Sequence, residues 1–320
     1  MILEPFVKSH EEEIVALWNR ELGRTFPMQL RLLQQNWTLD PRLLKEGSWV
    51  ARDTVGGSIT GFVAVKLAHP EDGRFGLSQG QGWISALLVA SAQRYQGTGG
   101  LLLRKAEEAL RRAGASRIAL GNDLHLRMFP GIPSELEPVK QWFERRGYFY
   151  REEAFDLIKT YAEDEATDLP PLGEAFMRVA VPADRDALTE FMARCFPGTW
   201  DLQHRDYWER GGTGQEYVLL EHQGKLIGFC RMNTIHAPLL AQNVYWSPLL
   251  EGELGGVGPL GIDEAYRGHR YGLSIVQGAI HFLRTRGVRH IVIDTTPFVD
   301  FYGKLGYTVW KSYAKYDKPL

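Results

Sequence analysis

The feature that most constrains this chain is an internal repeat, because a sequence that passes twice through one order of elements predicts two similar folding units. Each half begins with a short apolar strand and an amphipathic helix, followed by two strands around a tight turn. An apolar strand then enters a glycine-bearing loop and a long helix, and another strand, a short helix and a closing segment follow. Because six segments keep this order, we interpret the chain as a duplication.

The register of the repeat shows where the two halves differ in length. Arg94 and Arg267 stand 173 positions apart, whereas Phe143 and Tyr302, further along, stand 159 positions apart. The first half therefore carries 14 extra residues, which we place at 124–137. The two prolines, glycine and phenylalanine of this insert predict a shaped loop that either lines an acceptor pocket or packs on the surface.

The stretch 162–173, AEDEATDLPPLG, separates the two copies. It is acidic, carries two prolines and a glycine at its end and has no apolar period, as an exposed linker does. The sequence thus predicts an N-terminal domain at 1–161, a linker at 162–173 and a C-terminal domain at 174–320. The mixture of strands and amphipathic helices in each half predicts the α/β (α+β) fold class.

Composition excludes several classes of function. Hydrophobic residues make up 44% of the chain and charged residues 24%, with a formal net charge of -2, which is typical of a globular protein and speaks against a nucleic-acid partner. The two cysteines, Cys195 and Cys230, form no metal-like cluster, so we expect no metal. The N-terminus is unlike a signal peptide, and no apolar run approaches the length of a membrane span. We therefore expect a cytoplasmic protein without a membrane partner.

The glycine-bearing loop between strand and helix indicates an anion site in each half. Free backbone N–H groups and the positive end of the helix converge there, and both favour a phosphate or pyrophosphate. The glycines at 97, 99 and 100 lack the spacing of a Rossmann fingerprint. Neither loop contains the Gly-Lys-Ser/Thr of a Walker A motif.

The loop Arg94-Tyr95-Gln96-Gly97-Thr98-Gly99 resembles the Arg/Gln-x-x-Gly-x-Gly/Ala loop of the GNAT acetyltransferase superfamily. The segment FYGKLGY at 301–307 and the order of elements fit that family as well. The resemblance covers nearly the whole chain and is similar in arrangement to mycothiol synthase-like bacterial tandem GNAT proteins. It implies two tandem GNAT folds, each a mixed, centrally splayed sheet flanked by helices, and acetyl-CoA (coenzyme A) as the co-substrate.

The resemblance also implies two sets of cofactor-binding residues. Strand positions that pair with the pantetheine amides match Leu87, Val89, Leu260 and Ile262. Loop positions that hold the pyrophosphate match Arg94, Tyr95, Gln96, Gly97, Thr98, Gly99 and Gly100 in the first half, and Arg267, Gly268, His269, Arg270, Tyr271 and Gly272 in the second.

The two copies differ at the positions that the family uses for chemistry. Tyr302 matches the tyrosine that protonates the departing thiolate, whereas the first half has Phe143 there. The second half has Arg270 where the first has Gly97; an arginine there still offers its N–H to the phosphate, and its positive charge favours the ligand if its φ is negative. We therefore predict that the C-terminal half is catalytic. The N-terminal half either binds acyl-CoA without turnover or is structural.

Asp294, at the end of a strand, is the predicted general base, and the alternative is that it caps the following segment. Together these residues predict an N-acetyltransferase that acts on the primary amine of a small-molecule acceptor, such as an amino sugar, an amino acid derivative or a polyamine-like metabolite. Two alternatives stay open: a non-catalytic acyl-CoA-binding regulatory protein, and a protein or peptide N-acetyltransferase. A monomer and a homodimer are both compatible with the sequence.

Overall fold

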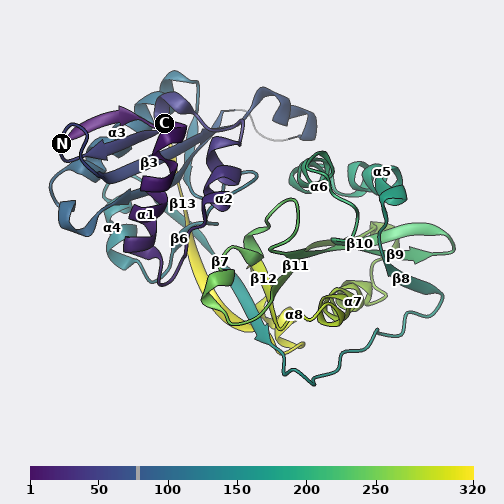
Figure 1. Cartoon of the computed structure of the whole chain (residues 1–320). Coiled ribbons are helices and arrows are strands. Elements are labelled where there is room, and N and C mark those ends of the chain that lie inside the picture. The colour runs from purple at the N-terminus through teal and green to yellow at the C-terminus, as the bar shows by residue number, and fades with distance from the viewer. Residues whose placement is uncertain (77–79) are drawn as a thin grey trace. The chain divides into compact units, whose positions relative to one another are not determined.

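The computed structural model describes residues 1–76 and 80–320, which form two compact units (Figure 1). Unit 1 comprises Met1–Ala154 together with Lys311–Leu320, and unit 2 comprises Phe155–Trp310. Within the described residues, no helix is both long enough and apolar enough to cross a membrane.

Unit 1 is built on a mixed sheet in the order β1-β2-β3-β4-β5-β13, with β6 also pairing to β13. The β4–β5 pair is parallel and the other neighbours are antiparallel. The strands are β1 (Ile2–Pro5), β2 (Trp49–Arg52), β3 (Ile59–Leu67), β4 (Gln81–Val89), β5 (Arg117–Leu120), β6 (Ile132–Pro133) and β13 (Thr308–Pro319).

The helices of unit 1 are α1 (Glu11–Leu22), α2 (Leu30–Leu33), α3 (Thr98–Arg112) and α4 (Glu137–Glu144), and a π-helical turn η2 (Gln34–Thr38) follows α2. Helix α3 forms because its apolar residues recur on one face, where Leu102, Ala106 and Leu110 are buried against the sheet. It ends just before Gly114, whose positive φ of 84° suits a glycine at the end of a helix.

Unit 2 repeats this plan with the sheet order β8-β9-β10-β11-β12-β7, in which β11 and β12 are parallel. Its strands are β8 (Ala175–Val179), β9 (Tyr217–His222), β10 (Lys225–Thr234), β11 (Leu254–Ile262), β12 (His290–Thr296) and β7 (Phe149–Thr160). Its helices are α5 (Arg185–Cys195), α6 (Thr199–Glu209), α7 (Tyr271–Thr285) and α8 (Val299–Gly303).

The two faces of the unit 2 sheet have different partners, as Figure 1 shows with α5 and α6 on one face and α7 on the other. Alternate residues of β10 divide between them. Cys230 and Met232 pack in the apolar cluster that contains α7, whereas Phe229 meets Phe191 and Phe196 near α5. Helices on both faces of a mixed sheet confirm the predicted α/β (α+β) fold class.

The closing strand of each half completes the sheet of the other unit. Residues of β7 from Phe155 onward pair with β12 in unit 2, and residues of β13 from Tyr313 onward pair with β6 and β5 in unit 1. The compact units thus differ in this respect from the sequence ranges 1–161 and 174–320. The limits of the two sequence copies and of the linker at 162–173 stay a prediction.

Candidate active site

The sheet of unit 2 opens into a fork between β11 and β12. Their parallel pairing ends at Gly256 and Val292, although both strands run on. The β10–β11 pairing is irregular just beyond this point. Val257 pairs with Met232 and Leu260 with Cys230, so three steps along β11 match two steps along β10. The strands beyond Gly256 therefore present open backbone groups to the fork.

Leu260 and Ile262 lie on the open edge of β11. The N–H of Asp263 donates to Ile227 O at 2.8 Å, so the backbone N–H and C=O groups of Asp263 and of every second residue before it point toward β10. By the alternation of an antiparallel pair, the N–H and C=O groups of Leu260 and Ile262 point toward the fork. The same reasoning applies to Leu87 and Val89 in unit 1, because the N–H of Ala90 donates to Thr60 O. An extended chain of amides such as pantetheine fits an edge of this kind.

The predicted phosphate loop of unit 2 leads from this edge into the N-terminus of α7. Arg267 Nε donates to Ile262 O at 3.2 Å, which ties the loop to the strand. Gly268 has a φ of 89°, and the next residue, His269, stacks on the ring of Tyr271. A Cβ added at Gly272 would meet no atom within 4 Å, so space is open beside the first turn of α7. These features fit a pyrophosphate at the helix N-terminus.

Arg270 has a φ of 63°, so the condition of a negative φ, under which its charge was expected to favour the phosphate, is not met. It is the N-cap of α7 and takes the left-handed conformation that Gly97, with a φ of 87°, takes before α3. The turn into the helix demands this conformation whatever the residue, and a residue with a Cβ is strained there by about 1–2 kcal/mol. The strained residue therefore lies directly before the first turn of α7, inside the predicted phosphate loop.

We predict that Arg270→Gly raises the free energy of unfolding by roughly 1 kcal/mol, because the backbone strain is larger than the extra chain entropy of glycine. The same change is expected to weaken acetyl-CoA binding about two- to fivefold, since one exposed cation beside the phosphates is lost. Chemical denaturation and calorimetric titration measure the two effects. The reciprocal Gly97→Arg should only destabilise, and tighter acetyl-CoA binding by Arg270→Gly would contradict the role of the cation.

In unit 1, the carboxylate of Glu21 lies beside the predicted phosphate loop. Glu21, at the end of α1, accepts from Ser91 N at 3.0 Å and from Arg94 Nη2 at 2.9 Å. Arg94 also donates to Val89 O, and Gln96 Nε2 donates to Ala92 O. Glu21 thus lies beside the start of the loop, bound to Arg94 and to the N–H of a residue three positions before it, and its negative charge opposes the binding of another anion there.

The rest of that loop keeps the predicted shape. Tyr95 is fully exposed with a φ of 62°, and α3 begins at Thr98, directly after Gly97. A Cβ on Gly99 would make ordinary contact with Trp142, and one on Gly100 would approach only the Arg104 side chain.

Asp294 lies on β12, one arm of the fork in unit 2, and Tyr302 lies on α8, which follows β12 in the chain. The Tyr302 side chain is 7% exposed and packs in the apolar cluster of α7. Burial raises the pKa of its hydroxyl above the ordinary value, and nearby Cys230 and Asp294 raise it further. Tyr302 therefore holds its proton at neutral pH, as a general acid must.

Asp294 does not cap α8. The N-cap of α8 is Phe298, and the hydroxyl that accepts from Phe298 N, at 3.0 Å, belongs to Thr296. Asp294 Oδ1 instead accepts from Asn243 Nδ2 at 2.7 Å. The capping alternative raised from the sequence is therefore wrong, and the carboxylate belongs to the polar side of the fork.

Four polar residues at this fork were missed from the sequence; we call Arg231, Asn233, Gln242 and Asn243 the fork cluster. Asn233 Nδ2 donates to Gly258 O at 2.9 Å, and Asn243 lies so close to Gly256 that a Cβ there would be 1.9 Å from its Oδ1. All four are buried. Among the described residues no hydrogen-bond partner exists for Arg231 Nε and Nη2, Asn233 Oδ1, Asn243 Oδ1 and both amide atoms of Gln242.

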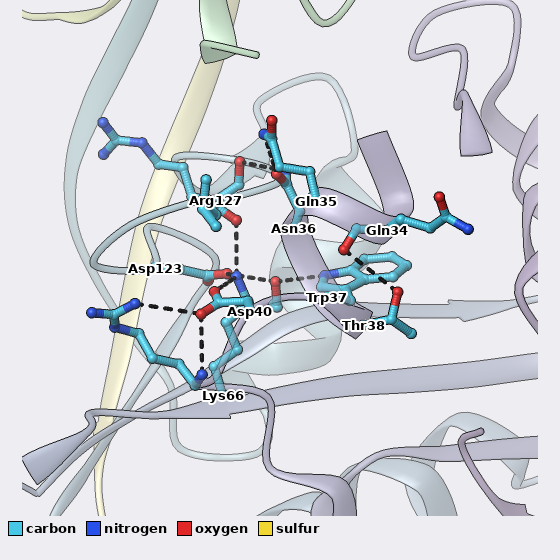
Figure 2. Close-up of polar contacts among 12 residues, drawn as sticks. Gln34, Gln35, Asn36, Trp37, Thr38, Asp40, Lys66, Asp123 and Arg127 are labelled. Carbon is cyan, nitrogen blue, oxygen red and sulfur yellow. Dashed lines mark hydrogen bonds and ion pairs between the residues drawn. The ribbon is translucent and has the colours of Figure 1, made fainter. Parts of the chain in front are cut away.

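The matching fork of unit 1 is filled by charges that pair with one another (Figure 2). The β4–β5 pairing ends at Ile84 and Leu120. Lys66, fully buried, lies 2.9 Å from Asp40, 3.0 Å from Asp123 and 2.8 Å from Leu126 O. Ser85, the residue after the last pair, donates to Asp123, and Trp37 Nε1 donates to Ser85. Lys66 thus forms ion pairs with both buried carboxylates, although Asp40 Oδ2 and Asp123 Oδ1 accept no hydrogen bond among the described residues.

Phe143 takes the place in unit 1 that Tyr302 has in unit 2, and Tyr148 and Tyr150 follow it in the chain. Phe143 is buried against Tyr148, whose hydroxyl donates to Glu107 at 2.9 Å. Burial and the charge of Glu107 raise the pKa of Tyr148, so it holds its proton in this contact. Tyr150 is 52% exposed.

A forked mixed sheet with a helix N-terminus at the end of its open edge, present twice, defines a tandem fold suited to acyl-CoA. The model of the Acetyltransferase (GNAT) family matches residues 11–129 and 185–307. The chain therefore belongs to the GNAT acetyltransferase family, with two family domains in tandem, as the sequence motifs predicted.

Two relatives indicate the branch of the family. The mycothiol acetyltransferase of Catenulispora acidiphila is 25% identical over 266 residues, 79% of this chain and 75% of that protein. The mycothiol acetyltransferase of Corynebacterium glutamicum (strain R) is 35% identical over 78 residues. That second match spans 23% of this chain and 27% of the relative, so the chain covers about a quarter of its length.

Solved structures share the tandem fold. A glucosamine N-acetyltransferase region in a fungal multi-domain GH3 β-N-acetylglucosaminidase aligns with a TM-score of 0.85 and 25% identity over 99% of this chain and 38% of that one. A tandem GNAT protein from the clavulanic acid biosynthesis pathway aligns with a TM-score of 0.70 and 14% identity over 99% and 98% of the two chains. The second likeness shows the fold alone.

Proposed function

We propose that this protein transfers the acetyl group of acetyl-CoA to the primary amine of a small molecule, and that unit 2 carries the active site. The observation that supports this choice is the contrast between the two forks. In unit 1, the buried Asp40 and Asp123 have cations beside them, Lys66 next to both and Arg42 next to Asp40. In unit 2, the fork cluster leaves buried polar atoms without partners among the described residues, next to Tyr302 and Asp294. Buried polar groups that lack partners are costly unless a ligand or water satisfies them.

An amino sugar is the acceptor class that we favour. The structural relative of highest identity among those above is described as a glucosamine N-acetyltransferase region, and the sequence relatives as mycothiol acetyltransferases. A ring with several hydroxyl groups would satisfy the amide oxygens of Asn233 and Asn243 as acceptors. Nothing comparable in the fork favours a peptide.

The residues around the fork divide the work of acyl transfer. Acetyl-CoA supplies an activated thioester. The first turn of α7 and Arg267 hold its phosphates, and the backbone of Leu260 and Ile262 orients the pantetheine. As the amine nitrogen bonds to the carbonyl carbon and the C–S bond breaks, Asp294 takes the proton of the amine. Tyr302 gives its own proton to the departing sulfur.

A matched pair of loop variants tests which unit works. Gly272 and Gly99 are each the second residue of their helix, α7 and α3, where an aspartate favours the helix but repels a phosphate. Gly272→Asp is expected to raise KM for acetyl-CoA about tenfold or more, because a like charge within a few ångströms costs 1–4 kcal/mol. Gly99→Asp should leave turnover unchanged. Thiol release from acetyl-CoA with a panel of amino sugars, amino acid derivatives and polyamines measures both.

The opposite pattern, in which only Gly99→Asp impairs turnover, would assign the activity to unit 1. If acetyl-CoA binds but no amine or peptide in the panel is acetylated, the alternative of a non-catalytic acyl-CoA-binding protein replaces the proposal.

A further inference from the structure

Arg231 is a buried cation on the face of the unit 2 sheet that α5 and α6 cover. Its neighbours Cys230 and Met232 point to the α7 face, and Arg231 points the other way, with its guanidinium 5.4 Å from the Tyr207 ring and 5.6 Å from the Tyr217 ring. The residue is 3% exposed. Within residues 1–76 and 80–320, no carboxylate lies within 4.0 Å of it, and Nε and Nη2 lack a hydrogen-bond acceptor.

Other buried cations of this protein have carboxylate partners. Lys66 pairs with Asp40 and Asp123, as described above, and Arg42 pairs with Asp72 through two nitrogens. Arg52 is held by Glu13. A guanidinium that is withdrawn from water needs such a partner, because aromatic rings replace only part of its hydration.

One carboxylate, Glu216, lies near the tyrosine rings that face Arg231, but within residues 1–76 and 80–320 it forms no ion pair with Arg231 at 4.0 Å or less. Glu216, beside Tyr217 in the chain, accepts a hydrogen bond from the Tyr207 hydroxyl. His204, which meets Tyr217, carries no charge at neutral pH, because burial and then the charges of Arg231, Arg205 and Arg185 lower its pKa to about 3. The rings of Tyr207 and Tyr217 turn their faces toward the Arg231 guanidinium. The expected partner of Arg231 therefore lies outside the chain.

The position of Arg231 connects it to the fork. It stands two residues before Asn233 on β10, so both side chains point to the same face, about 7 Å apart. Asn233 in turn bonds to Gly258 O, at the point where β11 and β12 have separated. A small molecule whose amine lies at the fork near Asn233 would reach Arg231 with a group that lies about 7 Å from the amine.

We propose that the acceptor carries an oxyanion, a carboxylate or a phosphate, and that Arg231 is the residue that binds it. This inference rests on the proposed function and adds a requirement to the acceptor. Asn233 and Asn243 contact the polar atoms between the amine and the anion, and Arg231 selects acceptors that carry the charge.

Matched acceptors that differ only in the anion test the proposal. Glucosamine 6-phosphate is compared with glucosamine, and 4-aminobutanoate with its amide, so that a phosphate and a carboxylate are each assayed against a neutral counterpart. We expect the wild-type protein to have a kcat/KM at least tenfold higher for an anionic member than for its neutral counterpart. Arg231→Gln should lose that preference, with a fall of about 30- to 100-fold on the anionic acceptor and less than threefold on the neutral one. Arg231→Lys should restore part of it.

A second readout separates ligand binding from a structural role. Arg231→Met removes a charge without a partner, so its thermal midpoint without acceptor should equal or exceed that of the wild type, whereas the anionic acceptor should raise only the wild-type midpoint. Arg286→Gln, at an exposed arginine that donates to Gln215 O, is the control and should change neither readout.

Equal losses by Arg231→Gln on neutral and anionic acceptors would overturn the inference, and so would a wild-type preference for the neutral members. If none of the four compounds is acetylated, the proposed function fails for them, and calorimetric binding in the presence of CoA decides the inference separately. Binding of an anionic compound that depends on Arg231 supports it, and the absence of such binding overturns it.

Discussion

Replacing Tyr302 by phenylalanine is expected to lower kcat about 100-fold or more and to leave KM for acetyl-CoA nearly unchanged. The substitution keeps the buried ring and its packing but removes the one proton that this residue can give to the leaving sulfur. General acid catalysis contributes about 10²–10⁴ in rate, so the loss is large even if water replaces part of the function. Steady-state kinetics with a saturating amino-sugar acceptor measures it.

The pH profile distinguishes the acid from the base. Because burial raises the pKa of Tyr302 above its ordinary value of 10.0, the wild-type rate should not fall between pH 7 and pH 10 through loss of this proton. Asp294→Asn should instead lower the rate about tenfold, since an amine of near-neutral pKa is already partly deprotonated. Tyr148→Phe, at a tyrosine bonded to Glu107 in unit 1, is the control and should not change kcat. Unchanged turnover in Tyr302→Phe would show that the acid is another group.

Replacing Lys66 by methionine is expected to lower the free energy of unfolding by about 3–5 kcal/mol at pH 7. Lys66 is fully buried between Asp40 and Asp123, and its removal takes the nearest cation from both buried carboxylates, leaving Asp40 with Arg42 at 3.4 Å. If unit 1 is structural, the folded fraction should keep its kcat. Denaturant unfolding monitored by tryptophan fluorescence, to which Trp37 of the same network contributes, measures the loss.

The destabilisation should shrink as the pH falls from 7 toward 4. Burial is the largest effect on the pKa of Asp40 and would raise it, but the charges and hydrogen bonds of Lys66 and Arg42 together outweigh burial and hold the pKa below the ordinary 3.8. In the wild type, the contribution of Asp40 is therefore lost only as pH falls through that lowered value. In Lys66→Met only Arg42 still opposes the larger effect of burial, so we expect the pKa of Asp40 to rise above 3.8 and the variant to lose stability as the pH increases past that value.

Lys140→Met is the matched control, because Lys140 pairs with Glu137 at the surface. It should cost less than about 1 kcal/mol. Equal losses for the two variants would mean that the buried network contributes no more than an exposed pair.

Local signals in the sequence were reliable where the backbone alone decides the structure. The two loops could be located because a strand, a glycine and an amphipathic helix leave few alternatives, and α3 and α7 begin at Thr98 and Tyr271. The family assignment followed from the same motifs. The sign of φ at Arg270 could not be inferred, because residue preference argued for a negative value while the turn before α7 requires a positive one.

The fork cluster was not predicted, although the sequence held a signal. In FCRMN, at 229–233, polar residues alternate with apolar ones inside a strand that is otherwise buried. That pattern indicates a strand with a polar face, and a polar face is normally exposed to solvent. Only the covering helices α5 and α6 and the turn that holds Gln242 and Asn243 make it an interior surface.

By itself, the sequence determined that the chain is a duplicated GNAT fold and where each phosphate loop begins, because these depend on local periodicity and on glycine positions. The tertiary structure decided two further matters. It assigned the closing strand of each half to the sheet of the other unit, since backbone hydrogen bonds between strands carry almost no sequence signature. It also showed which fork is filled by ion pairs, because the partners of Lys66 come from positions as distant in the sequence as 40 and 123. Arg231, by contrast, contacts aromatic rings and has no carboxylate within 4.0 Å among the described residues.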